Sequence, residues 1–122
     1  MSTRDIGLLG EEKGLKFLKK QGYKILEKNF VTNFGEIDII AKNRACLAFV
    51  EIKYRRSDKF GTPADAINAV KQEKIIKSAL QYIKIYKPKN KMFRFDALLI
   101  GPDEDQIELI KDAFSSSVRY TF

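Results

Sequence analysis

The 122-residue chain contains no histidine and no tryptophan, and its only cysteine is Cys46. These absences exclude a Ser-His-Asp triad, a Cys-His pair, a histidine general base and a disulfide within the chain. A zinc site built from cysteine and histidine ligands is excluded as well. Any catalysis must therefore use carboxylates, lysines, hydroxyls, the backbone or a bound metal ion.

Long apolar runs are also missing. Stretches such as Leu47–Val50 and Ala97–Ile100 have the length of a strand, far short of the ~20 residues that cross a bilayer. The first residues lead into charge rather than into an apolar segment, so we expect no signal peptide. We expect a cytoplasmic protein without a membrane partner, folded as a single domain over residues 1–122, since domains are typically about 100–150 residues long.

Basic residues outnumber acidic ones, 23 against 16, which gives a net charge of +7. Two basic clusters carry much of this excess: Lys53, Arg55, Arg56 and Lys59 in one, and Lys84, Lys87, Lys89, Lys91 and Arg94 in the other. Such clusters favour a polyanionic partner such as nucleic acid. The alternative is a lysine-rich surface that only keeps the protein soluble.

Hydrophobic periodicity and turn residues predict seven elements in the order α-β-β-β-α-β-β. The predicted helices are Thr3–Gln21 and Pro63–Tyr86, the second capped by Thr62, and the predicted strands are Tyr23–Phe30, Glu36–Ala41, Leu47–Tyr54, Phe93–Ile100 and Gln106–Lys111. The first three strands suggest an antiparallel meander, and the long helix before the fourth strand permits a parallel crossover. The predicted fold class is therefore α/β, a mixed central sheet flanked by helices.

One side of the first predicted helix combines small residues with an acidic one. Gly7, Gly10 and Gly14 form a stripe, although each glycine costs a helix about 1 kcal/mol. Close approach of the helix to the sheet explains the stripe, and simple tolerance of glycine is the alternative. Glu11 lies on the apolar face of the same helix, so we expect it to point inward.

Charged residues interrupt two otherwise apolar predicted strands. Because strand side chains alternate between faces, Asp38 shares a face with Glu36, and Glu51 shares a face with Lys53. The reverse face is expected to hold Ile37, Ile39, Val50 and Ile52.

The register of this hairpin decides whether the charges meet. A two-residue turn at Asn43-Arg44 makes the numbers of opposed residues sum to 87, whereas a sum of 89 would place Asp38 directly opposite Glu51. Any odd sum brings Asp38, Glu51 and Lys53 to one face, and an even sum separates them. A functional site at this position therefore requires an odd register.

Carboxylates crowded on adjacent strands repel each other and lose solvation. A hard divalent cation relieves this repulsion, and Mg²⁺ prefers one or two carboxylates together with carbonyl oxygens, water and phosphate. A lysine two residues from a carboxylate can orient a water or stabilise charge on phosphorus, so metal-assisted phosphodiester hydrolysis needs no histidine. The alternative is an ordinary ion pair between Glu51 and Lys53 on an edge strand.

The two segments that carry these charges, Gly35–Ala41 and Phe49–Lys53, resemble the PD-(D/E)xK nuclease signature in its Holliday-junction-resolvase-like form. More closely, the chain resembles the YraN-like family of largely uncharacterised bacterial proteins. The likeness spans nearly the whole chain and includes Gly7–Glu11, Phe60–Ala64, Lys71, Arg94–Asp96 and Asp112–Phe114. The chain departs from the signature before Asp38, where Glu36 and Ile37 stand in place of the name-giving proline.

The resemblance implies a restriction-endonuclease-like fold and, in active relatives, DNA cleavage that depends on Mg²⁺ or Mn²⁺. Asp38 and Glu51 would bind the metal, with the Ile52 carbonyl as a further ligand. Lys53 would be the catalytic lysine. Glu11 matches the acidic residue of the first helix, and it would support the metal or a water next to it.

Candidate contacts to nucleic acid follow the carboxylates in the sequence: Arg55, Arg56, Lys59, Lys71 and Gln72. The first three belong to a polar, basic segment that leaves the strand directly after the site, where they could hold phosphates on either side of the scissile one. The last two lie on the second predicted helix. An ordinary surface loop and ordinary helix positions are the alternatives.

Two further residue sets are interpreted as structural. Arg94 and Asp96 share a strand face and are expected to form an ion pair. Cys46 is expected to be a small core residue.

We therefore expect a Mg²⁺-dependent nuclease that acts on DNA, including branched or repair intermediates. A non-catalytic nucleic-acid-binding module of the same fold is the alternative. RNA as a substrate and a homodimer both remain open. A phosphohydrolase of small nucleotides ranks last, because the sequence has no glycine-rich loop that would hold phosphates.

Overall fold

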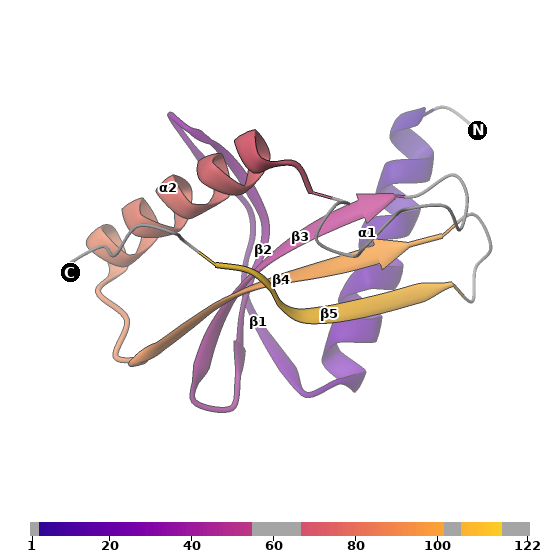
Figure 1. Ribbon diagram of the computed structural model, residues 1–122. Coiled ribbons are helices and arrows are strands. Elements are labelled where there is room, and N and C mark those ends of the chain that lie inside the picture. The colour runs from indigo at the N-terminus through magenta and orange to yellow at the C-terminus, as the bar shows by residue number, and fades with distance from the viewer. Residues whose placement is uncertain (1–2, 55–66, 102–105, 116–122) are drawn as a thin grey trace.

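The computed structural model describes residues 3–54, 67–101 and 106–115, with only the backbone described for 3–9. Two helices and one five-stranded sheet form this part of the chain (Figure 1). The elements are α1 (Thr3–Lys20), β1 (Tyr23–Thr32), β2 (Gly35–Asn43), β3 (Cys46–Tyr54), α2 (Ala69–Tyr86), β4 (Met92–Ile100) and β5 (Ile107–Phe114). The predicted element order and fold class are confirmed. Neither of these helices is long and apolar enough to cross a membrane.

The strands follow one another across the sheet in the order β1-β2-β3-β4-β5. All neighbours are antiparallel except β3 and β4, which are parallel. This arrangement confirms the predicted meander and the parallel connection through α2. Cys46, at the start of β3, is buried as expected.

The two helices cover opposite faces of the sheet, so β3 and β4 are enclosed on both sides (Figure 1). On the α2 face, the core includes Phe49, Ile75, Ala79, Tyr82 and Leu99. On the α1 face, it includes Leu18, Val50, Ile52 and Leu98. Burial on both faces explains why β3 is apolar over nearly its whole length, and it makes a charged residue on that strand conspicuous.

α1 packs closely on the sheet through two of its glycines. A Cβ atom at Gly10 would collide with the Tyr54 ring, and one at Gly14 would lie 2.8 Å from the Leu98 Cδ2 atom. The close approach predicted from the glycine stripe is confirmed at these two positions, whereas Gly7 lies outside the residues whose surroundings are described. The contact brings the neighbouring Glu11 near the end of β3.

The hairpin of β1 and β2 is strongly bent. Ile39 packs on the α1 side but Ile37 packs on the α2 side, so the prediction that both cover the reverse face is wrong for Ile37. β1 causes the bend, since its register shifts after Ile25 and Asn29 has a left-handed φ of 53°. Such irregularities bend a strand and increase its twist. The bend turns the hairpin tip toward α2.

α2 begins later than predicted. Ile67 and Asn68 are not helical, and the Asn68 side chain caps the helix by accepting a hydrogen bond from the Lys71 N–H at 2.9 Å. The prediction of a continuous helix from Pro63 is therefore wrong, because asparagine is as strong a cap as the threonine chosen from the sequence. The predicted cap Thr62 and residues 63–66 lie outside the described residues.

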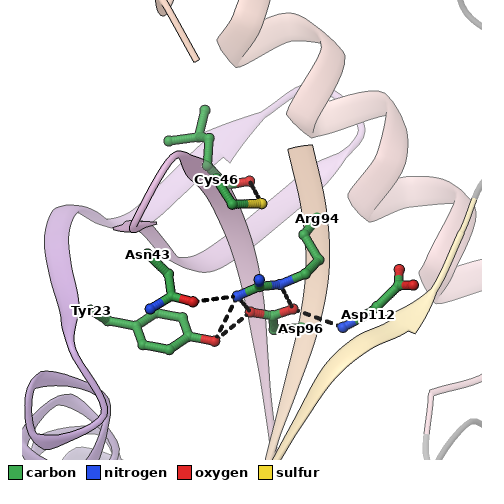
Figure 2. A network of polar contacts seen from close by, with 7 residues as sticks. Tyr23, Asn43, Cys46, Arg94, Asp96 and Asp112 are labelled. Carbon is green, nitrogen blue, oxygen red and sulfur yellow. Dashed lines mark hydrogen bonds and ion pairs between the residues drawn. The ribbon is translucent and has the colours of Figure 1, made fainter. Parts of the chain in front are cut away.

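A buried polar network joins β1, β2, β4 and β5 (Figure 2). The wholly buried Asp96 carboxylate accepts hydrogen bonds from Arg94 Nε at 2.7 Å, the Tyr23 hydroxyl at 2.7 Å and the Asp112 N–H at 2.9 Å. Arg94 also donates to Asn43 Oδ1 at 3.0 Å. The predicted Arg94–Asp96 ion pair is confirmed, and the network joins strands on the side of the sheet away from Lys53.

Candidate functional site

The register of β2 and β3 brings the two acidic motifs together. The turn between the strands consists of Arg44 and Ala45, so opposed residue numbers sum to 89, the second of the two registers considered from the sequence. The last paired residues toward the site are Ile39 and Val50. The odd register that the site requires is confirmed. The pairing ends there, and beyond it Asp38 and Glu51 still lie close enough to shift each other's pKa.

Asp38 lies where the ladder between β2 and β3 ends. Its Oδ2 atom accepts a hydrogen bond from the Ile52 N–H at 2.8 Å. The side chain thereby takes the place of a strand partner for this backbone group, which would otherwise need another acceptor. This bond fixes the carboxylate of Asp38 against β3.

The side chain of Glu51 is only 9% exposed and points to the α2 side of the sheet. Its Oε1 atom lies 3.5 Å from the Lys71 Nζ atom. Its Oε2 atom is buried and has no hydrogen-bond partner among the described residues. Buried polar atoms without a partner are uncommon and point to strain, chemistry or an ion.

Both carboxyl groups resist ionisation. Burial, and then the neighbouring Asp38, raises the pKa of Glu51 to about 7, although Lys71 opposes the shift. Burial also raises the pKa of Asp38, against the opposing Ile52 N–H bond. A proton or a cation between the two carboxyl groups would relieve their mutual repulsion and their loss of solvation. Carboxyl groups whose pKa is raised in this way are typical of functional sites.

The raised pKa of Glu51 predicts that the metal-free protein loses stability as the pH rises. Between the ordinary value of 4.5 and the folded value of about 7, the folded state binds more protons than the unfolded state, so stability falls across this window. We expect Glu51 to contribute a loss of about 3 kcal/mol between pH 5 and pH 8.

Urea unfolding in EDTA at both pH values measures this loss. Glu51→Gln removes the titrating group, so the difference between the two proteins reports Glu51 together with its coupling to Asp38 and cancels the ionisable residues elsewhere. The same pH dependence in wild type and variant would contradict the assignment.

Two further residues, Glu11 on α1 and Tyr54 at the end of β3, lie near Asp38. Glu11 points toward the sheet, as expected, and its Oε1 atom accepts a hydrogen bond from Asn29 Nδ2 at 3.0 Å. The Tyr54 ring packs on Gly10. Burial raises the pKa of Tyr54, and the charges of Asp38 and Glu11 raise it further. Tyr54 therefore stands in the electric field of both acids.

Of the remaining predicted site residues, only some lie among the residues that the structure describes. Lys53 is exposed at the end of β3, two residues from Glu51 and hence on the same strand face. Lys71 contacts the Glu51 carboxylate, and the Gln72 side chain donates to the Ile67 carbonyl at 2.7 Å. Three of the predicted contacts, Arg55, Arg56 and Lys59, lie outside the described residues.

The structure describes no group of three or more acidic or cysteine side chains close enough together to hold a metal ion. The carboxylates that it does bring together are those of Asp38 and Glu51. Sequence reasoning missed three contributors: the contact of Lys71 with Glu51, the support of Glu11 by Asn29, and the position of Tyr54. Only the last had a local signal: the glycine stripe of α1 predicted a close approach to the sheet, and Tyr54 lies at that approach beside Gly10.

Comparison with known proteins identifies a family. The family model described as "Uncharacterised protein family UPF0102" matches residues 10–100, which include both carboxylates and both lysines of the site. A UPF0102 protein of Caldicellulosiruptor saccharolyticus is 45% identical over 118 residues, covering 93% of this chain and 100% of that protein. A UPF0102 protein of Thermodesulfovibrio yellowstonii is 46% identical over 114 residues, covering 93% and 99%. One from Dictyoglomus thermophilum is 46% identical over 100 residues, covering 82% and 85%.

Proposed function

Because this chain belongs to the UPF0102 family, whose name states no activity, we propose from the site itself that it is a metal-dependent nuclease. Its substrate is DNA, including branched or repair intermediates, and the reaction is hydrolysis of a phosphodiester bond. One observation carries the proposal: the buried Glu51 carboxyl keeps an oxygen without a hydrogen-bond partner and lies beside the Asp38 carboxyl, which disfavours its ionised form.

The donor set fits Mg²⁺ or Mn²⁺. Asp38 and Glu51 offer carboxylate oxygens, and Ile52 adds a backbone carbonyl, all hard oxygen donors of the kind these ions prefer. Glu11 would support a water next to the metal from α1. When bound, the ion supplies Lewis-acid polarisation of the phosphate and lowers the pKa of a water.

The two lysines serve the phosphate side of the site. Lys53 extends from the end of β3 into solvent, where its ammonium can orient the attacking water and stabilise negative charge on phosphorus. Lys71 holds the Glu51 carboxylate from α2. These groups meet the requirement, set by the composition, that catalysis proceed without histidine.

Cleavage assays test this proposal. We expect Mg²⁺- or Mn²⁺-dependent cleavage of branched, single-stranded or duplex DNA by the wild type, and a loss of at least about 100-fold in Asp38→Asn and in Lys53→Ala, as for other removals of a charge-stabilising group. Lys42→Ala is the matched control, since Lys42 is exposed on β2 away from the site. Robust cleavage retained by both folded site variants would refute the assignment of the site.

A non-catalytic nucleic-acid-binding module is the second candidate. Lys71 already neutralises part of the charge on Glu51, and the net charge of +7 favours binding to a polyanion without any chemistry. Calorimetry separates the two functions. A lack of Mg²⁺ or Mn²⁺ binding even with DNA present, together with tight, salt-sensitive DNA binding, would favour the module.

A further inference from the structure

A groove runs between the β1–β2 turn and the outer side of α2, which lie side by side in Figure 1. It consists of a hollow of about 740 Å³ and a smaller one of about 370 Å³, which share Asn33, Phe34 and Lys77. The larger volume is in the range of about 300–1,000 Å³ that is typical of ligand sites. Leu80 and Ile85 complete the apolar lining of the larger hollow.

Apolar side chains in this groove are unusually open to solvent. Phe34 is 46% exposed, Ile85 55% and Val70 64%. Single exposed apolar residues are ordinary, but a contiguous set along a hollow marks a binding surface.

The charges along the groove are mainly positive. Lys74, Lys77 and Lys84 line it, and the one acidic residue among its described lining residues, Glu73, pairs with Lys77 at 3.2 Å. The Lys77 Nζ atom also lies 5.8 Å from the centre of the Phe34 ring. An aromatic face and an ammonium group therefore stand together, which suits a partner that is both aromatic and anionic.

The groove leads toward the carboxylate pair. Lys74 follows Lys71 by about one helical turn, and Lys71 contacts Glu51. Along the other wall, Phe34 precedes Asp38 by four residues of chain, about 13 Å in a strand. An elongated ligand lying in the groove would thus reach the site at one end.

We infer that this groove binds a single-stranded segment of nucleic acid, with a base stacked on Phe34 and phosphates paired with Lys77 and Lys84. The inference rests on the proposed function, because it names the form in which the substrate reaches the site. An unpaired base has a free face for stacking on an aromatic ring, whereas bases inside a duplex are already stacked on their neighbours. The excess of lysines over Glu73 supplies the cations that follow a backbone with one negative charge per nucleotide.

Fluorescence anisotropy in EDTA tests the inference without metal or cleavage. The labelled probes are a 12-nucleotide oligo-dT, an abasic strand of the same length and a 12-base-pair duplex. We expect Phe34→Ala to weaken oligo-dT binding about 5-fold to 100-fold and to leave abasic binding unchanged, since only a base can stack. Lys77→Gln/Lys84→Gln should weaken both single strands and reduce the slope of log K against log salt by about 1.4.

Matched controls lie outside the groove. Val31→Ala removes an exposed apolar side chain from β1, and Lys24→Gln/Lys42→Gln removes two exposed lysines that are paired in register across β1 and β2. Both should bind oligo-dT within about 2-fold of the wild type. Thermal melts confirm that every variant is folded.

Equal binding of oligo-dT by Phe34→Ala and wild type would overturn the inference, and so would an equal effect of Phe34→Ala on the abasic strand. Binding of a labelled acidic amphipathic peptide instead, lost in Phe34→Ala, would also overturn it and assign the groove to a protein partner. If the nuclease proposal fails, through a lack of metal binding and cleavage, the oligo-dT result stands unaffected, so the two failures are distinguishable.

Discussion

Glu51→Gln is expected to abolish metal-dependent activity and, at the same time, to make the metal-free protein more stable at pH 8. The carboxylate is buried with one oxygen unpartnered, and its pKa is raised to about 7 by burial and by Asp38. At pH 8 the folded protein must hold it ionised, which costs about 3 kcal/mol relative to the unfolded chain. Glutamine has the same shape, no charge, and an amide that can donate to the Asp38 carboxylate. We expect a gain approaching that magnitude, with activity reduced at least about 100-fold.

Urea unfolding at pH 8, in EDTA and in excess Mg²⁺, measures both effects. The wild type should gain about 2.7 kcal/mol when Mg²⁺ is at 100 times its dissociation constant, and Glu51→Gln should gain nothing. Glu73→Gln is the matched control, because Glu73 also pairs with a lysine of α2 but its side chain is 63% exposed. Its stability should change by less than about 0.5 kcal/mol.

A loss of stability in Glu51→Gln would mean that its contact with Lys71 is a structural ion pair. Removing one partner of such a pair leaves the other charge uncompensated, which destabilises a fold. A gain in stability therefore indicates that Glu51 belongs to a cation-binding site, and a loss indicates that Glu51 and Lys71 form an ion pair that holds α2 on the sheet. Activity measurements alone would not make this distinction, since a misfolded variant is inactive as well.

Alternation along strands made the carboxylate pair predictable from sequence. Glu51 and Lys53 interrupt a strand that is otherwise apolar, so Glu51 could be identified as exceptional before its partner was placed. The requirement for an odd register then followed from geometry alone. The actual register depended on where the two-residue turn falls. Asn43 favours a turn, but it is paired with Cys46 in the sheet, and the turn consists of Arg44 and Ala45.

Tertiary contacts decided the features that sequence did not predict correctly. Ile37 changes sides because β1 bends at Asn29. α2 begins at Ala69 and is capped by Asn68 rather than by Thr62, because asparagine is at least as good a cap as threonine. The Lys71 contact with Glu51 depends on that start and on how α2 lies over the sheet. Nothing in the spacing of the two residues indicates it.

Asp96→Asn is expected to destabilise the protein by about 3–5 kcal/mol, the typical cost of breaking a buried ion pair. The substitution keeps the volume of the side chain but removes its charge, and its amide nitrogen faces donors rather than acceptors. Arg94 and the Tyr23 hydroxyl both donate to the carboxylate, as does the Asp112 N–H (Figure 2). Domains are stable by only about 5–15 kcal/mol in total, so the melting temperature should fall by roughly 10–20 °C.

Asp112→Asn is the control that tests the network rather than the residue type. Asp112 contacts Asp96 through its backbone N–H while its own carboxylate points away (Figure 2), and asparagine tolerates the left-handed φ of 55° found there. Thermal and urea unfolding should show little change. Arg94→Met combined with Asp96→Asn should cost at least about 1 kcal/mol less than the sum of the single variants, because each single change already breaks the same pair. If Asp96→Asn instead matches Asp112→Asn, the four strands are held by apolar packing alone, and the buried charges at this end of the sheet would themselves need a functional explanation.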